Sequence, residues 1–459
     1  MKLSSRLVGW WGAVEWVCLL AIAPFLLFAA PTRAPLLLAI PLLWVLRRVL
    51  LGRFVPSTPV DVPVLILMVM AGVGFCVSPD PRWSQMKIDA LLLGVGLLYA
   101  TVDLLRPAGR MKWVPAGVIA LSFAFLGLGL LGTRWVAKIP LLGAMTGGLP
   151  GGLAWLPEGE TSFNPNVIGG ALLLVLPFSL SLLLTGWADK SARRRWGWVA
   201  AEGLVAVLCL GLLFLTQARG AWLGFAVSLV ALLVLAGGDL GRLGVGLLVV
   251  ALPALALLST AIGTPAAQGT VAAPGTVAAQ GAAWGLIQAG AGSTRLLSTV
   301  TIGQRLEIWS RAQYAIADFP FTGPGLDAFQ YVMPAMYPLF QSHAGRFIPH
   351  AHNEFLQVAL DLGLPGLVAW LALYLATFSM LWSALRHGHG GLSRALALGG
   401  SGALIGHLAY SMTDSSVLDA KPNVVFWVIV GLSVVLYQAS PSPQASLPRE
   451  DGSVRTSHG

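Results

Sequence analysis

The chain has 459 residues, of which 56% are hydrophobic and only 10% are charged, and its formal net charge is +9. A soluble globular domain carries roughly 25% charged residues, so this composition excludes a water-facing surface of normal extent. The excess of basic residues is typical of the ends of membrane helices and does not indicate nucleic-acid binding. The hydrophobic runs are long and continuous rather than alternating, which predicts spanning helices rather than barrel strands.

About twelve hydrophobic stretches approach the ~20 residues that a bilayer-spanning helix needs. They lie at roughly 13–30, 35–50, 60–77, 88–105, 113–132, 166–187, 196–215, 220–237, 241–261, 364–383, 395–412 and 422–438. A signal peptide is conceivable at the basic N-terminus, but a second hydrophobic stretch follows almost at once, which favours a first spanning helix. The predicted fold is therefore all-α, a polytopic membrane helical bundle.

Lys and Arg are unevenly distributed over the predicted loops. With the N-terminus placed in the cytoplasm, 17 basic residues fall in cytoplasmic segments and seven in the short outer loops. Positive charge favours the cytoplasmic side, so we expect both termini to be cytoplasmic.

The predicted organisation has four parts. They are about nine helices over 1–261, a large extracytoplasmic loop over 262–363, about three helices over 364–440, and a disordered Pro/Ser-rich cytoplasmic tail over 441–459. Within the loop, 263–293 is rich in Ala, Gly, Thr and Gln and is typical of a loosely packed insertion. From Arg305 the apolar positions recur at helical spacing, 319–325 has turn chemistry, and 328–337 is expected to form a short helix.

The segment Thr216-Gln217-Ala218-Arg219-Gly220 separates two hydrophobic stretches on the predicted outer side. One interpretation is that Arg219 anchors a helix end by extending its side chain to water. However, an Arg at the membrane edge is unfavourable without a partner or water, and the topogenic bias disfavours Arg on this side. Gln217 and Gly220 would let another group approach closely, so we favour a binding role for Arg219.

Further basic side chains lie in the large loop. Arg305 precedes Arg311 by about a turn and a half of the predicted helix, where Glu307 could pair with Arg311 on a solvated face. Arg346 lies later in the loop. A guanidinium group binds phosphate through two parallel hydrogen bonds, so a phosphate group is the ligand that converging Arg side chains would favour.

His350, His352 and Asn353 follow Pro349 in the same loop. Pro349 can open a helix, and His or Asn near its start would lie at the positive end of the helix dipole. That environment favours the neutral imidazole that a general base requires. Two His at this spacing could also bind a metal, but neither a Cys nor a second cluster completes a ligand set, so we expect no metal and no cofactor.

Phe163-Asn164-Pro165-Asn166 comes directly before a hydrophobic stretch. Asn is a good N-cap, so Asn166 could simply begin a helix, and contact with a substrate is the alternative. Taken together, Arg side chains, a candidate base and the absence of an acidic metal cage fit a site at the bilayer edge. Such a site would hold a lipid-linked diphosphate and activate a hydroxyl acceptor.

The sequence resembles the O-antigen ligase and polymerase family of bacterial envelope proteins. The resemblance rests on Gln217 to Trp222, on Arg305 to Trp309, on Gly323-Pro324-Gly325, and on a His-Asn pattern. In that pattern His352 and Asn353 are followed by nine residues, Gly363, two residues and Gly366. The motifs cover about 219–366, and the hydropathy profile is similar over nearly the whole chain.

The resemblance implies metal-independent, inverting glycosyl transfer on the outer face of the cytoplasmic (inner) membrane. The donor would be a glycan on undecaprenyl diphosphate, and the acceptor a lipid, a glycan or a protein hydroxyl, for a ligase, a polymerase or an oligosaccharyltransferase respectively. By motif position, Arg219 and Arg305 would bind the diphosphate and His352 would orient or deprotonate the acceptor. Gln217, Arg311, Arg346, His350, Asn353 and Asn166 would support them.

Two other classes of function compete with this interpretation. A transporter or flippase places ionisable groups near the bilayer midplane, where this sequence offers few candidates. A scaffold for envelope assembly would not need His352 or Arg219.

Overall fold

The computed structural model describes residues 5–27, 31–107, 109–135, 140–150, 163–185, 192–247, 299–339, 348–388, 391–415 and 423–440. Within these ranges the chain is helical, and the only β-type pairing is an isolated bridge between Thr133 and Phe163. The predicted insertion at 263–293 and the tail at 441–459 lie outside the described residues.

The bundle consists of long apolar helices. These are α1 (Ser5–Leu27), α2 (Ala39–Leu51), α3 (Asp61–Val77), α4 (Pro81–Leu105), α5 (Val114–Gly132), α7 (Pro165–Thr185), α8 (Ala192–Leu215), α9 (Arg219–Ala236), α14 (Glu354–His387), α15 (Gly391–Ser411) and α16 (Asn423–Ala439). Shorter elements join them: η1 (Pro31–Leu38), η2 (Arg110–Trp113) and α6 (Pro140–Thr146). Two further helices, α12 (Thr299–Asp318) and α13 (Phe329–Met336), come from the predicted large loop.

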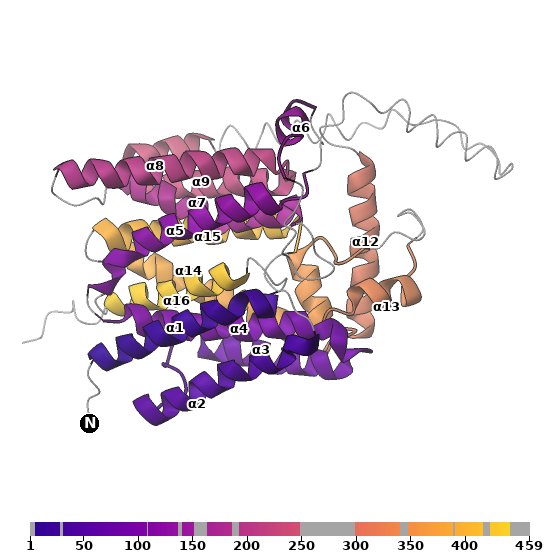
Figure 1. The fold of residues 1–459 in the computed structure, drawn as a ribbon. Coiled ribbons are helices and arrows are strands. Elements are labelled where there is room, and N and C mark those ends of the chain that lie inside the picture. Colours follow the sequence, from indigo (N-terminus) through magenta and orange to yellow (C-terminus); the bar gives the residue numbers. More distant parts are fainter. Residues whose placement is uncertain are drawn as a thin grey trace, which may run out of the picture.

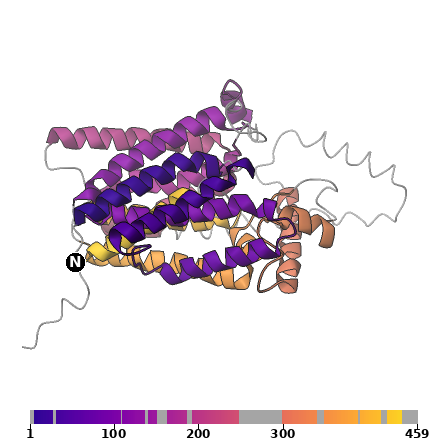
Figure 2. The same cartoon turned by 60° about the horizontal axis from the view of Figure 1, so that its bottom comes forward.

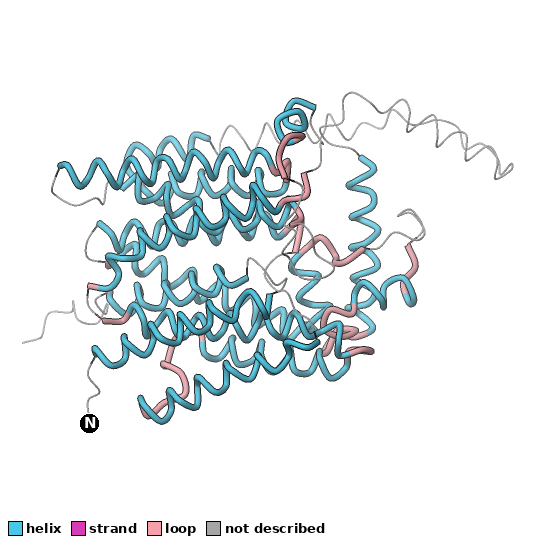
Figure 3. Tube along the Cα trace, viewed as in Figure 1, coloured by secondary structure: helices cyan, strands magenta, loops and turns pink. Residues whose placement is uncertain are grey.

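The bundle helices run side by side, and α12 and α13 lie at one end of the bundle (Figures 1 and 2). α1 begins at the opposite end (Figure 1). Many of the loops that join helices also gather at the α12 end (Figure 3). This arrangement places the elements of the large loop and the start of the chain at opposite ends of the bundle.

Among the described helices, α15, α4 and α14 each pack against several others. α15 packs against α7, α9 and α14, α4 packs against α1 and α16, and α14 also packs against α3. Small residues permit the closest approaches, as expected for helices that associate in a membrane. A Cβ on Gly224 of α9 would lie 2.7 Å from the carbonyl oxygen of Gly406 in α15.

The structure confirms the predicted fold class. Seven described helices are long and apolar enough to cross a membrane. Eleven of the twelve predicted stretches coincide with helices, whereas 241–261 lies mostly outside the described residues, so the count of twelve stays a prediction. The predicted loop helices are also confirmed, as α12 and α13.

Candidate functional site

Asp414, which belongs to none of the predicted motifs, lies in the turn after α15 and is 5% exposed. Its Oδ2 accepts a hydrogen bond from Nδ2 of Asn166 at 2.9 Å and another from the Tyr410 hydroxyl at 3.3 Å. Its Oδ1 accepts from the Ser415 amide at 3.0 Å. The carboxylate is thus held in one orientation by donors from α7, from α15 and from its own turn.

The same Oδ1 of Asp414 faces two imidazoles of the predicted site. It lies 3.4 Å from Nδ1 of His352 and 3.6 Å from Nε2 of His350. Burial raises the pKa of Asp414, but the hydrogen bond from His352, the charges of His350 and His352 and the Ser415 amide outweigh it and lower the pKa to about 2. Asp414 is therefore ionised at physiological pH and provides a fixed negative charge beside both rings.

The backbone at His352 has a conformation that is uncommon for a non-glycine residue, with φ of 50°. Such backbone strain is found preferentially at functional sites. The amide of His352 donates to Nδ1 of His350 at 3.2 Å, and the two rings are 4.4 Å apart. In the neutral form of His350 the proton is therefore on Nε2, the nitrogen that faces Asp414.

The helix that follows the two histidines begins later than Pro349, the position at which the sequence placed a possible start. α14 starts at Glu354, and Asn353 is its N-cap, with a side chain that accepts from the Leu356 amide at 3.1 Å. A proline near a helix start is favoured only if the next residues are helical, and here the αL residue His352 intervenes. Asn353 is thus a structural residue that fixes where α14 begins.

A buried chain of hydrogen bonds supports the histidine loop. The Ala351 amide donates to Oε1 of Gln357 at 2.9 Å, and Nε2 of Gln357 donates to Asp361 at 3.1 Å. Asp361 in turn pairs with Lys87 of α4 at 2.6 Å. The Ala351 carbonyl accepts from the indole of Trp309 at 3.0 Å, so the peptide between the two histidines is held from both sides.

The Arg219 segment packs against the turn that holds Asp414. Arg219 is half-buried and is the first residue of α9, and Gln217 before it is 1% exposed with φ of 52°. A Cβ on Gly220 would overlap the side chain of Thr413. The structure therefore brings this motif, Asp414 and the histidine loop to one end of the bundle.

Arg305 lies on α12, one turn before Trp309, the residue that bonds the histidine loop. It continues the stripe of Ile308 and Ala312, which are both buried. Arg311 lies on another face of α12, with its guanidinium 5.8 Å from the Tyr314 ring. Arg305 thus shares the face of α12 that carries Trp309 and Arg311 does not, while Arg346 lies outside the described residues.

The expected N-cap role belongs to Asn164 rather than to Asn166. The Asn164 side chain accepts from the Asn166 amide at 2.9 Å, which leaves the Asn166 side chain to donate to Asp414. Asn166 therefore contacts the site through Asp414.

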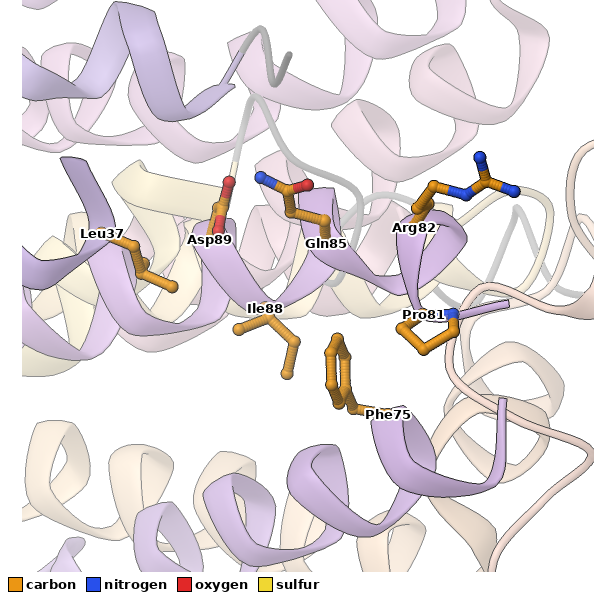
Figure 4. Close-up of a pocket in the computed structure, with 7 residues that line it drawn as sticks. All are labelled: Leu37, Phe75, Pro81, Arg82, Gln85, Ile88 and Asp89. Carbon is orange, nitrogen blue, oxygen red and sulfur yellow. The ribbon is translucent and has the colours of Figure 1, made fainter. Parts of the chain in front are cut away.

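His350, His352 and Asp414 each present a ligand-type atom, and these atoms lie within 4.8 Å of one another. Asp414 thus supplies a third candidate ligand, which is distant in the sequence from the two histidines whose spacing alone predicts no metal site. A pocket of about 330 Å³ lies elsewhere, at the start of α4, and includes none of these three residues. In it Gln85 and Asp89 project to one side of α4, and Phe75 and Ile88 are on the other (Figure 4).

Residues 204–371 match the family model described as O-Antigen ligase. The chain carries an O-antigen ligase domain. The match confirms the family resemblance, and the matched stretch contains Arg219, Arg305, His350 and His352. No curated protein matches the chain. The chain thus joins seven described helices that are long and apolar enough to cross a membrane to a stretch that matches an O-antigen ligase domain.

Asn166, Tyr410 and Asp414 lie outside the matched stretch. One signal for Asp414 exists in the sequence, because an acidic residue directly after a spanning stretch is unfavourable without a partner. The sequence gives no indication that this partner would be a histidine 62 positions earlier in the chain.

Proposed function

We propose that this O-antigen ligase domain protein transfers a glycan from undecaprenyl diphosphate to an acceptor hydroxyl at the outer face of the cytoplasmic membrane. The observation that carries the proposal is the placement of the buried Asp414 carboxylate 3.4 Å from Nδ1 of His352. A carboxylate on Nδ1 favours the tautomer in which Nε2 carries the lone pair, and it stabilises the imidazolium that forms when Nε2 accepts a proton. His352 is thereby suited to act as a general base.

In the proposed reaction, Nε2 of His352 takes the proton of the acceptor hydroxyl. The acceptor oxygen forms a bond to the anomeric carbon of the donor sugar, and the bond from that carbon to the diphosphate oxygen breaks. Undecaprenyl diphosphate leaves with the electron pair, and the anomeric centre is inverted. Arg219 and Arg305 bind the diphosphate and stabilise the charge that develops on the leaving oxygen.

The tautomer of His350 supports a mechanism without a metal. A metal bound between His350, His352 and Asp414 would use the lone pair of Nε2 of His350. The proton of the His350 ring would then be on Nδ1. There it would face the N–H group of the His352 amide, which donates to Nδ1 at 3.2 Å, so two donors would oppose each other. Without a metal, Nδ1 of His350 accepts from the His352 amide and Nε2 faces Asp414. We therefore propose that His350 positions His352 and Asp414.

The acceptor defines three variants of the proposal: a lipid for a ligase, a glycan repeat unit for a polymerase, or a protein for an oligosaccharyltransferase. A transporter or flippase would use acidic side chains inside the bundle, and two of these, Glu15 and Asp103, already have basic partners. Arg47 pairs with Glu15 and lies 3.6 Å from Asp103, which also pairs with Arg53 at 2.7 Å. We further propose that both termini are cytoplasmic and that His352 lies on the outer side.

A lipid-linked glycan transfer assay in proteoliposomes tests the proposal. His352→Ala and Arg219→Ala should each abolish transfer, whereas Arg242→Ala should retain it, because Arg242 is exposed and paired with Asp239. Each variant must insert and fold like the parent protein. Normal transfer by both site variants would refute the roles given to His352 and Arg219. Loss of transfer in excess chelator, restored by added metal, would refute a mechanism without a metal.

A further inference from the structure

The turn between α12 and α13 carries an exposed aromatic side chain on a rigid support. Phe321 is 72% exposed. The carbonyl of the preceding Pro320 accepts from the Leu364 amide at 2.7 Å, and the Leu326 amide donates to the Gly74 carbonyl at 3.0 Å. The turn is thus bonded to α14 at one end and to α3 at the other.

Two glycines allow the turn to pack this closely. Gly323 has φ of 67°, and a Cβ there would overlap the Leu360 carbonyl. Gly363 has φ of 66°, and a Cβ there would overlap the Phe321 carbonyl. The backbone of the turn therefore lies directly against the kink in α14, and the position of Phe321 is fixed by main-chain contacts.

Phe321 lies where an exposed apolar stripe of α14 begins. Leu364, Val368, Leu371 and Leu375 recur at helical spacing and are 42%, 66%, 38% and 71% exposed. Since α14 is long and apolar enough to cross a membrane, this stripe faces lipid. The amide that bonds Pro320 belongs to the first residue of the stripe, so the exposed ring is continuous with a lipid-facing surface.

The lipid-facing surface continues on α3, which packs against α14. Val62, Leu65 and Val69 of α3 are 68%, 61% and 55% exposed and share one helix face with Cys76, which is also exposed. The turn is bonded near the end of that face, through Gly74. Phe321 thus lies at the edge of two neighbouring lipid-facing stripes.

We propose that Phe321 is a membrane anchor that inserts among the lipids at the α12 end of the bundle, at the boundary between acyl chains and head groups. The ligand is the bilayer lipid itself, recognised by apolar contact as in other interfacial anchors. The turn that carries the anchor also packs on Leu360, next to Asp361 of the chain that supports the histidine loop. The anchor thereby fixes the depth of His352 relative to the outer leaflet.

Spin labelling in proteoliposomes tests this anchor without measuring transfer activity. The result for the anchor is therefore independent of whether the proposed reaction is correct. Cys18, Cys76 and Cys209 are replaced by Ala, and a nitroxide is attached to a single new Cys at position 321. Position 375 is the lipid reference. Position 82 is the water reference, because Arg82 is an exposed charged side chain that forms an ion pair with Asp80.

A label at 321 should be relaxed more strongly by oxygen than by a water-soluble nickel complex, as is expected for a label at 375. The oxygen-to-nickel ratio at 321 should be smaller than at 375, because the anchor lies less deep in the bilayer. Stronger relaxation by nickel, as at 82, would show that the ring faces water and would overturn the proposal. Protection from both reagents would also overturn it, because the ring would then be covered by protein, such as a second copy of this chain.

Discussion

Replacing Asp414 with Asn removes one negative charge and leaves the size of the side chain nearly unchanged. The proposed general base becomes an imidazolium in the transition state, and Asp414 is the buried carboxylate beside it. At the 3.4 Å between Oδ1 and Nδ1 of His352, the attraction between unit charges is about 5 kcal/mol for an effective dielectric constant near 20. A tenfold change in rate corresponds to ~1.4 kcal/mol, so this attraction limits the effect to between 10³- and 10⁴-fold.

Solvent reduces the effect below that limit, because the His352 side chain is 29% exposed. We therefore expect Asp414→Asn to lower kcat by about 10²- to 10³-fold, within the ~10²–10⁴-fold that general bases contribute. KM for the lipid-linked donor should change little, since the diphosphate is bound by Arg side chains. The measurement is steady-state transfer in proteoliposomes, with thermal unfolding followed in parallel.

Tyr410→Phe is the matched control. It removes the hydroxyl that donates to the Asn166 carbonyl at 2.8 Å and lies 3.3 Å from Asp414, and it leaves the carboxylate charge in place. The rate should fall by no more than about tenfold, since the shorter of the two hydrogen bonds is to a neutral carbonyl and such a bond contributes ~0.5–1.5 kcal/mol. If Asp414→Asn retained more than a third of the parental kcat, or if both variants lost activity equally, the charge of Asp414 would have no special role and the reasoning would be wrong.

Three further substitutions test the support of the site. Gln357→Leu leaves the Ala351 amide without its acceptor, so this amide should exchange hydrogen faster and kcat should fall, while an unchanged exchange rate would contradict the packing. Gly323→Ala should destabilise the protein by at least ~1–3 kcal/mol, because φ is 67° and the methyl group meets the Leu360 carbonyl, and thermal unfolding would show it. Lys87→Met leaves the buried Asp361 carboxylate without its cation and should lower stability by ~3–5 kcal/mol, and a variant as stable as the parent protein would refute that pairing.

The sequence predicts the bundle well because lipid imposes a simple rule on the backbone. Each spanning segment must satisfy its own peptide groups, so a hydrophobic run of sufficient length is a helix whatever it packs against. The same rule does not determine which helices pack against each other. The contact of α15 with α7 and α9 depends on small residues such as Gly224 and Gly406, and Gly is too common in this chain to identify such pairs in advance.

Part of the candidate site can be predicted from the sequence. The predictable residues belong to local motifs, and the others are brought to the site from distant positions in the chain. Arg219, Arg305 and His352 are recognisable because each belongs to a local motif within the matched stretch. Asp414 is not recognisable, because its role arises from the approach of a turn after α15 to the histidine loop. For Asn166 the preference of Asn for helix starts predicts capping as well as a contact in the site, and in the structure Asn164 is the residue that caps α7.

The spacing of the His-Asn motif has a physical explanation in the structure. Asn353 caps α14, the nine residues that follow form an unbroken helical segment, and Gly363 interrupts it with φ of 66°. At 1.5 Å per residue the segment holds the histidine loop and the Phe321 turn about 13–15 Å apart, and its 100° rotation per residue decides which side chains lie between them. Gln357 and Asp361 are one turn apart and therefore share the face that reaches Ala351 at one end and Lys87 at the other. A change of one residue in this spacing would turn the histidines away from Asp414, so the motif fixes a distance and an orientation as well as a base.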